Sequence, residues 1–181
     1  LGETWLRVPE SIKIVLEGKL RKNVEAKDII LSIIGQLTAE GANYMSIEFH
    51  GPAMQEIGVG GRMTLCNMSA EAGCKCAMAP FDKHTEAYLK EVGAPKYTVL
   101  DPDKDAEYAK VYTFDVSKIA PMVAKPHKVD NVVPASEVGD LAIDVALLGT
   151  CTNGRIEDLE AAARILDGKK IAKGVRLLVY P

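Results

Sequence analysis

Hydrophobic positions recur with two different periods in the first part of the chain, and each period predicts a different element. In residues 11–17, Ile12, Ile14 and Leu16 alternate mainly with charged or polar side chains, as in a half-buried strand. The stretch 26–39 instead carries apolar residues three and four positions apart, which is typical of an amphipathic helix. The sequence therefore predicts a strand followed by a helix.

Three further elements are predicted before residue 94. NYMSIEFHG reads as a strand near 44–49, GRMTLCNMSAEAGCK as a helix near 60–74, and HTEAYLKEVG as a short exposed helix from 84 onward. The charged stretch DPDKDAEYAK, residues 101–110, is expected to be a solvated surface.

The pattern changes in the last third of the chain. Residues 117–136 contain three prolines and no sustained period, which favours a crossing between domains. The apolar run AIDVALLG, the turn TCTNGR, the helical stretch IEDLEAAARIL and the run VRLLVY then follow in order. They predict a βαβ unit with parallel strands and a right-handed crossover. We therefore expect an α/β domain, an interdomain crossing and the start of a further α/β domain, over residues 1–118, 119–136 and 137–181.

Composition excludes several classes of protein. The 181 residues are 48% hydrophobic and 6% aromatic, with a formal net charge of −3, which argues against a dedicated nucleic-acid binder. No apolar run reaches the roughly 18 residues of a membrane span, and the first residues carry no secretory signal pattern, so a cytoplasmic location is expected. The chain opens without methionine and closes on RLLVYP, so we expect it to be a segment of something longer.

The four cysteines have no CxxC spacing and predict no closed zinc site. Cys151 is the most informative, because it lies in the turn between a predicted strand and a predicted helix. In open α/β sheets that turn faces the ligand crevice, and a helix N-terminus favours a thiolate or a bound anion. Three interpretations stay open from spacing alone: a buried inert cysteine, a metal or cluster ligand, and a nucleophile.

Asn67 and Glu71 lie four residues apart on the predicted second helix, so their side chains should project from one face. That face either meets water or forms part of a polar site. His50 follows a predicted strand and is more typical of a structural histidine than of a functional one. His84 and His127 lie in polar surroundings and are expected to be solvated.

The stretch LLGTCTNGRIEDLEAAARIL, residues 147–166, resembles a signature of the aconitase family. The likeness is strongest to the branch of 3-isopropylmalate dehydratase and homoaconitase large subunits. It extends through EFHGPAMQEIGVGGRMTLCNMSAEAG (48–73), and AKDIILSIIGQLTAEGANY and KPHKVDNV add to it, so it covers almost the whole chain. The resemblance implies three-layer α/β/α domains, here the second domain and the start of the third.

In that family a [4Fe-4S] cluster is held by three cysteines, and one iron stays without a protein ligand. The resemblance implies that Cys151 is the first of these ligands, with the other two in a CxxC expected downstream of residue 181. The other cysteines would then be packing residues. By the same likeness, Asn67 lies by the cluster and Glu71 contacts the water or hydroxyl on the open iron. Asn153 and Arg155 would support the surroundings of the cluster.

The implied function is that of a hydro-lyase large subunit which converts 2-isopropylmalate reversibly into 3-isopropylmalate in leucine biosynthesis. Homoaconitase or a related hydro-lyase of 2-hydroxy polycarboxylates is the alternative. The implied partner is a small subunit that carries the swivelling domain, so this segment alone is expected to be incomplete. An RNA-binding apo-protein and an inactive fragment are two further hypotheses, and the net charge of −3 counts against the first.

Overall fold

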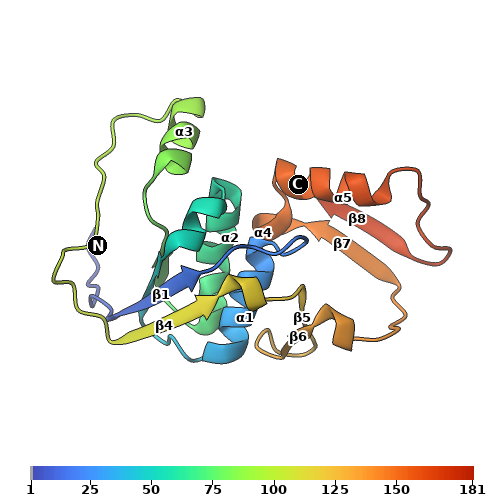
Figure 1. The fold of residues 1–181 in the computed structure, drawn as a ribbon, viewed down its shortest axis with the longest axis horizontal. Helices are drawn as coiled ribbons and strands as arrows, with labels where there is room; N and C mark the ends of the chain where they lie inside the picture. Colours follow the sequence, from blue (N-terminus) through green and yellow to red (C-terminus); the bar gives the residue numbers. More distant parts are fainter. Residues whose placement is uncertain (1) are drawn as a thin grey trace.

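The computed structural model describes residues 2–181 as two α/β units with a β-hairpin between them (Figure 1). In these residues the first unit has a four-stranded sheet in the order β3-β2-β1-β4, with every neighbouring pair parallel. Its strands are β1 (Ser11–Glu17), β2 (Ser46–His50), β3 (Cys76–Met78) and β4 (Lys110–Asp115).

Helices connect these parallel strands. They are α1 (Ala26–Leu37), α2 (Val59–Met68) and α3 (Lys83–Glu91), together with the short 3₁₀ turns η1 (Pro52–Glu56), η2 (Ser69–Ala72) and η3 (Val116–Lys118). Helix α1 packs against α2, whereas none of the α3 residues is buried. Among residues 2–181, no helix is long and apolar enough to cross a membrane.

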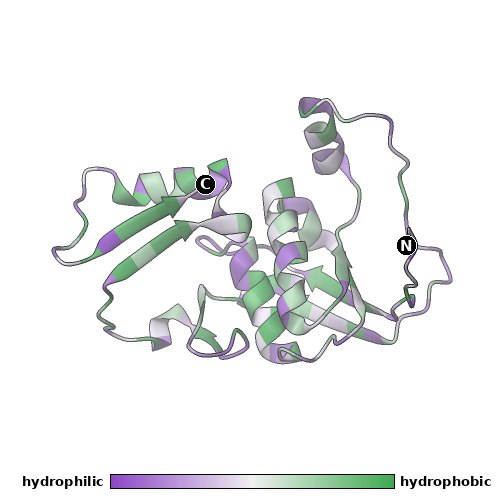
Figure 2. Ribbon diagram, turned by 180° about the vertical axis from the view of Figure 1, so that it is seen from behind, coloured by the Kyte–Doolittle hydropathy of each residue, from purple (hydrophilic) through white to green (hydrophobic). Residues whose placement is uncertain are grey.

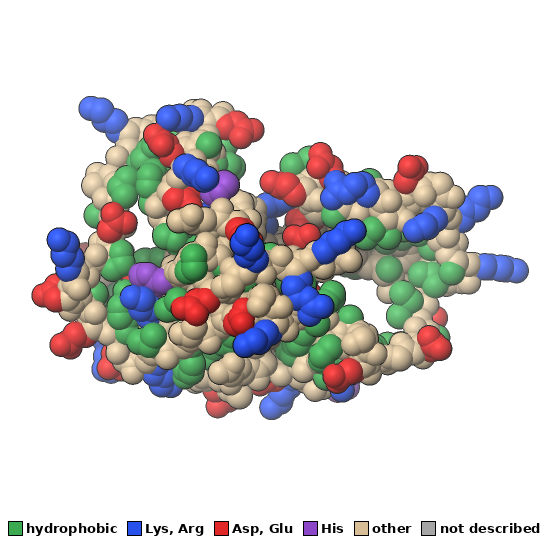
Figure 3. All heavy atoms as spheres, viewed as in Figure 1, with side chains coloured by type: hydrophobic (Ala, Val, Ile, Leu, Met, Phe, Trp, Pro, Cys, Tyr) green, Lys and Arg blue, Asp and Glu red, His purple; other side chains and the backbone are tan. Residues whose placement is uncertain are grey.

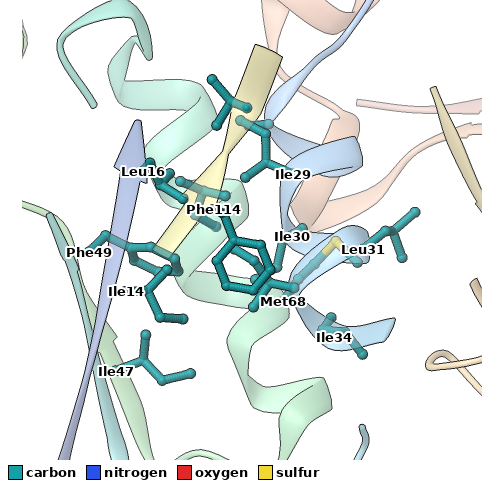
Figure 4. Packing of buried hydrophobic residues seen from close by; sticks show 14 of the residues in the cluster. Ile14, Leu16, Ile29, Ile30, Leu31, Ile34, Ile47, Phe49, Met68 and Phe114 are labelled. Atoms are coloured by element: carbon teal, nitrogen blue, oxygen red, sulfur yellow. The ribbon is translucent and has the colours of Figure 1, made fainter. Parts of the chain in front are cut away.

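The core lies between one face of this sheet and the helices α1 and α2. The period-2 pattern of β1 buries Ile12, Ile14 and Leu16 completely, while Lys13 and Val15 on the other face stay half-buried. Figure 4 shows the apolar side chains of α1 meeting those of β1, β2 and β4 in one cluster. Each fully buried aliphatic side chain contributes about 1.5–3 kcal/mol. The core therefore gives α2 a rigid support.

The rest of the chain forms the hairpin and the second unit. Strands β5 (Met122–Ala124) and β6 (Val132–Pro134) pair antiparallel, and β7 (Val145–Gly149) pairs in parallel with β8 (Arg176–Tyr180). The 3₁₀ turn η4 (Ala135–Glu137) follows the hairpin, and α4 (Thr150–Asn153) and α5 (Ile156–Leu166) connect β7 to β8. Figure 2 shows β7 and β8 as mostly hydrophobic strands.

Most predicted elements are confirmed, and so is the α/β class with parallel strands. Of the predicted three layers, the described residues provide the sheet and the helical layer of α1 and α2. The predicted helix 60–74 is shorter: α2 ends at Met68 and continues as the tighter turn η2. Strands β3 and β4 were not predicted, and Lys110, which was expected in a solvated stretch, begins β4.

The segment that was expected to cross between domains forms the β5–β6 hairpin. Hydrogen bonds attach this hairpin to α1. The Met122 backbone N–H donates to Asp28 Oδ1 (2.7 Å), and Asp130 Oδ2 accepts from the backbone N–H of Ala39 (3.0 Å), just beyond the end of α1. Prolines interrupt the period of this segment, but they do not prevent a three-residue strand at each side of the hairpin.

Candidate functional site

Cys151 lies in α4, a single helical turn that follows directly on the carboxyl end of β7 and is called the cysteine turn below. Strand β7 ends at Gly149, which has φ 127°. A Cβ atom at this position would collide with the backbone carbonyl of Tyr180. Thr150 then adopts φ 74°, a left-handed conformation that β-branched residues rarely take. Cys151 is exposed in this turn, so its interpretation as a buried inert residue is wrong.

Helix α2 of the first unit holds this turn of the second unit. Asn67 Nδ2 donates to the backbone carbonyl of Cys151 (3.0 Å), and Thr64 Oγ1 donates to the backbone carbonyl of Thr152 (2.6 Å). The two α2 residues are three positions apart and therefore share a face of the helix. The structure thus brings Asn67 and Cys151 together although they are 84 residues apart in the chain.

Glu71 lies just beyond α2, in the 3₁₀ turn η2, and its side chain is exposed. Asn67 is exposed as well, but its amide also contacts the Cys151 backbone, so the hypothesis that this face meets nothing except water is wrong for Asn67. For Glu71 the structure shows an accessible carboxylate next to the helix that reaches the cysteine turn.

Asn153 and Arg155 shape the chain between the cysteine turn and α5. Asn153 Nδ2 and the Arg155 backbone N–H both donate to the carboxylate of Asp158, over 2.9 and 3.1 Å. Arg155 Nη1 lies 3.4 Å from Thr64 Oγ1, to which it donates. Asn153 Oδ1 is buried, and in the described residues it accepts no hydrogen bond. Such unpaired buried acceptors are uncommon and are often explained by a missing water or ligand.

These residues line a cavity of about 220 Å³ where the two units meet. Its walls come from the start of α1, from the glycine-rich start of α2, and from the α4–α5 connection. Glu25 forms part of the wall; burial, with smaller effects from Asp28 and Asp158, raises the pKa of its carboxyl group, against a lowering by Arg164. The cavity therefore combines acidic side chains with the guanidinium of Arg155.

The remaining cysteines lie in different surroundings. Cys66 and Cys74 are half-buried beside the core, as expected of packing residues, and burial raises the pKa of each thiol to about 11. Cys76, at the start of β3, is exposed, so the expectation that it packs in the core is wrong. Within residues 2–181, no three cysteine, histidine or acidic side chains gather as a metal site. A metal or cluster at Cys151 would need further ligands from outside these residues.

The sequence reasoning missed Arg62, a buried arginine one turn into α2. Its side chain is 4% exposed, its Nε donates to the Ile57 carbonyl (2.9 Å) and its Nη2 to the Met54 carbonyl (2.8 Å). The guanidinium also pairs with Asp82 at 2.5 Å. The hydrogen bonds from Arg62 to the Asp82 carboxylate hold the pKa of that carboxyl below its usual range. An arginine in an otherwise apolar stretch was the available signal.

Two of the histidines, His50 and His84, form hydrogen bonds within the first unit. His50 Nε2 lies 3.3 Å from a Glu48 carboxylate oxygen that also accepts from Tyr108 Oη (2.7 Å), which agrees with the structural interpretation of His50. Burial, together with Glu48, raises the pKa of Tyr108 to about 12. His84, expected to be solvated, contacts the Gln55 carbonyl (3.0 Å), and His127 is exposed as predicted.

Comparison with known proteins decides the family. A model of the aconitase family (aconitate hydratase) matches residues 2–141 and 134–181, which is almost the entire chain. The chain belongs to the aconitase family. Its described fold, with parallel strands flanked by helices, agrees with an aconitase-like domain.

Several aconitase-family relatives match along the full length of the chain. It is 49% identical over 181 residues to a 3-isopropylmalate dehydratase large subunit of Heliobacterium modesticaldum, and 46% identical over 180 residues to one of Methanopyrus kandleri. It is also 46% identical over 180 residues to a probable methanogen homoaconitase large subunit of Methanosarcina mazei. These matches cover 99–100% of this chain but 43–46% of each relative. The chain therefore spans less than half the length of these relatives.

Proposed function

We propose that this chain is part of the large subunit of a hydro-lyase that interconverts 2-isopropylmalate and 3-isopropylmalate in leucine biosynthesis. The observation that carries the proposal is the exposed Cys151 in a turn that α2 holds at two successive carbonyls. Identity of 49% over the 181 residues of this chain to a dehydratase large subunit supports the choice of reaction. The residues 1–118, 119–136 and 137–181 would be one domain, a crossing and the start of another.

Cys151 would be one thiolate ligand of a [4Fe-4S] cluster. The residues present fit such a group, because the hydrogen bonds from Thr64 and Asn67 engage backbone oxygens and leave the exposed thiol free. The unpaired Asn153 Oδ1 is an acceptor in the same part of the chain. Further ligands would come from outside residues 2–181. When bound, the group would supply a Lewis-acidic iron for the hydroxyl and carboxylate of the substrate.

The other site residues would fix the backbone around Cys151 or hold a proton of the reaction. Asn67 would fix the backbone of Cys151, and the Glu71 carboxylate would hold the proton that accompanies the departing hydroxyl group. Asn153 and Arg155, which both donate hydrogen bonds to Asp158, would fix the segment that follows Cys151 in the chain. Proton removal from the neighbouring carbon needs a base, which we assign to the proposed small subunit.

The proposed substrate is a 2-hydroxy dicarboxylate, and the proposed partner is the small subunit. Similarity to a homoaconitase large subunit supports homoaconitate as the second candidate. The two are separated by kcat/KM for each acid, measured with the purified protein and its small subunit. A higher value for homoaconitate would replace the first candidate by the second.

The ligand assignment is tested by Cys151→Ser, with Cys76→Ser as the matched exposed-thiol control. Both variants and the unmodified protein, each prepared as the complete large subunit, are treated with iron and sulfide without oxygen, and the visible absorbance of the cluster is recorded. We expect Cys151→Ser to lose this absorbance and Cys76→Ser to retain it. Full cluster binding by Cys151→Ser would refute the assignment.

A further inference from the structure

Thr64 is a buried hydroxyl at the junction of the two units. Its residue is 3% exposed, and its Oγ1 lies 2.6 Å from the Thr152 carbonyl. The Gly60 carbonyl, one turn earlier in α2, is a competing acceptor at 3.3 Å. A threonine has a single hydroxyl proton, so the much shorter distance directs it to Thr152. The oxygen then accepts from Arg155 Nη1 at 3.4 Å.

The cysteine turn, which receives this hydrogen bond, has a strained backbone. Thr150 has φ 74°, and a β-branched residue is strained there, so its surroundings must hold it in place. Thr64 fixes the carbonyl that follows Cys151 in the chain, and Asn67 fixes the carbonyl of Cys151 itself. Two hydrogen bonds from α2 therefore restrain the backbone at Cys151 and at the residue that follows it.

We propose that Thr64 is a positioning residue, which fixes the Cys151 turn through the chain of hydrogen bonds Arg155–Thr64–Thr152. The effect on the turn is a property of the protein without any cofactor, while its benefit for cluster binding rests on the proposed function. A purely local role, in which the hydroxyl bonds back to its own helix, would involve Gly60 and would leave the turn unchanged.

The test compares Thr64→Val, which removes the hydroxyl, with Thr64→Ser, which keeps it. Ser69→Ala is the matched control, because Ser69 is fully buried in the following turn and its Oγ bonds to the Leu65 carbonyl (2.8 Å) within the same segment. Backbone hydrogen exchange of residues 150–154 is measured by mass spectrometry on the purified cofactor-free protein.

We expect Thr64→Val to accelerate this exchange roughly tenfold, as for the loss of one well-formed hydrogen bond. Thr64→Ser and Ser69→Ala should exchange these residues at nearly the unmodified rate. Thr64→Ala, with its higher helix propensity, repeats the comparison if the valine variant does not fold. Unchanged exchange without the hydroxyl, or equal acceleration in Ser69→Ala, would overturn the proposal.

Cluster binding is a separate readout. The protein used is the complete large subunit, which would supply the further ligands. If the unmodified subunit takes up iron and sulfide, its Thr64→Val variant should lose the visible absorbance of the cluster faster under a chelator than Ser69→Ala does. Equal loss would overturn the link between Thr64 and the cluster. If the complete unmodified large subunit takes up none, the proposed function fails, and the exchange comparison still decides whether Thr64 positions the turn.

Discussion

At the scale of single residues, burial divides the four cysteines into two chemical groups. Cys76 and Cys151 are exposed, whereas Cys66 and Cys74 are half-buried. Burial raises the pKa of the Cys66 thiol to about 11; Cys74 reaches about 11 through burial and the neighbouring thiols. Because the thiolate is the reactive form, the half-buried pair should react slowly at pH 8.

This division predicts the order of alkylation. Iodoacetamide at pH 8 should modify Cys151 and Cys76 well before Cys66 and Cys74, in the folded cofactor-free protein. The extent of modification is followed over time by mass spectrometry of peptides, with the urea-unfolded protein as the control in which all four react alike. Early modification of Cys66 would contradict the burial described here.

Part of the site could be predicted at this scale. The turn position of Cys151 followed from the strand and helix patterns, but spacing alone left three interpretations open, and the resemblance of TCTNGR to the aconitase signature favoured a cluster ligand. The contact between Asn67 and Cys151 joins residues 84 positions apart, and no local pattern encodes it. Arg62 escaped notice because its burial depends on Asp82, in a loop beyond the helix.

At the scale of elements, Arg62 connects three segments. It donates to carbonyls at the end of η1 and in the loop before α3, and it pairs with Asp82, whose carboxylate caps the first backbone N–H groups of α3. Because Arg62 belongs to α2, the same side chain stabilises the helix that reaches the cysteine turn.

Replacement of Arg62 by Met should therefore lower the free energy of unfolding by about 2–4 kcal/mol, since it leaves several acceptors without partners. The exposed ion pair Lys90–Glu86 (2.9 Å) provides the control: Lys90→Met should leave the free energy of unfolding nearly unchanged, because solvent screens an exposed pair. Urea unfolding of the two variants gives both values. A loss below about 1 kcal/mol for Arg62→Met would contradict this stabilising role of Arg62.

The same pair predicts a dependence of stability on pH. The pKa of Asp82 is lower in the folded protein than in the unfolded one, because Arg62 hydrogen-bonds its ionised form. Its contribution is therefore present above the ordinary pKa of about 4 and is lost as the pH falls through the lower folded value. Between pH 5 and pH 3, roughly, the melting temperature should fall less in Asp82→Asn than in the unmodified protein. An identical fall would contradict the assignment.

The sequence predicts the elements whose hydrophobic residues recur with a clear period. It does not predict the strands that bury few residues or are too short to show a period. Strand β1 and helix α1 follow their patterns closely, because one face of each enters the core. Strand β4 buries Phe114 alone among its residues and follows a charged stretch, so no alternation revealed it. The three-residue strands β3, β5 and β6 are too short to display a period; they form because neighbouring segments offer backbone partners.

At the scale of the whole molecule, burial is concentrated in the first unit. The buried hydrophobic residues lie between positions 12 and 119, whereas β7 and β8 expose Val145, Leu147 and Val179 by 46–54%. Figure 3 shows an opening beside the second unit with hydrophobic side chains at its rim. The second unit is therefore supported mainly by its contacts at the cysteine turn.

Hydrogen exchange should reflect this difference in the 181-residue chain. Backbone amides of β1, α1 and β2 should be protected at least tenfold more than those of β7, α5 and β8, because local opening is easier where few apolar contacts are lost. Exchange is measured by mass spectrometry, with residues 96–103, outside helices and strands, as the unprotected reference. Equal protection of the two units would contradict this description.

Catalysis tests whether the chain is part of an isopropylmalate-forming hydro-lyase, as we propose. The complete large subunit is loaded with iron and sulfide without oxygen, combined with the proposed small subunit and given 2-isopropylmalate. We predict the appearance of the unsaturated acid in the ultraviolet spectrum and of 3-isopropylmalate by chromatography, and loss of both in Cys151→Ser. Cluster-loaded protein that forms neither product would contradict the account.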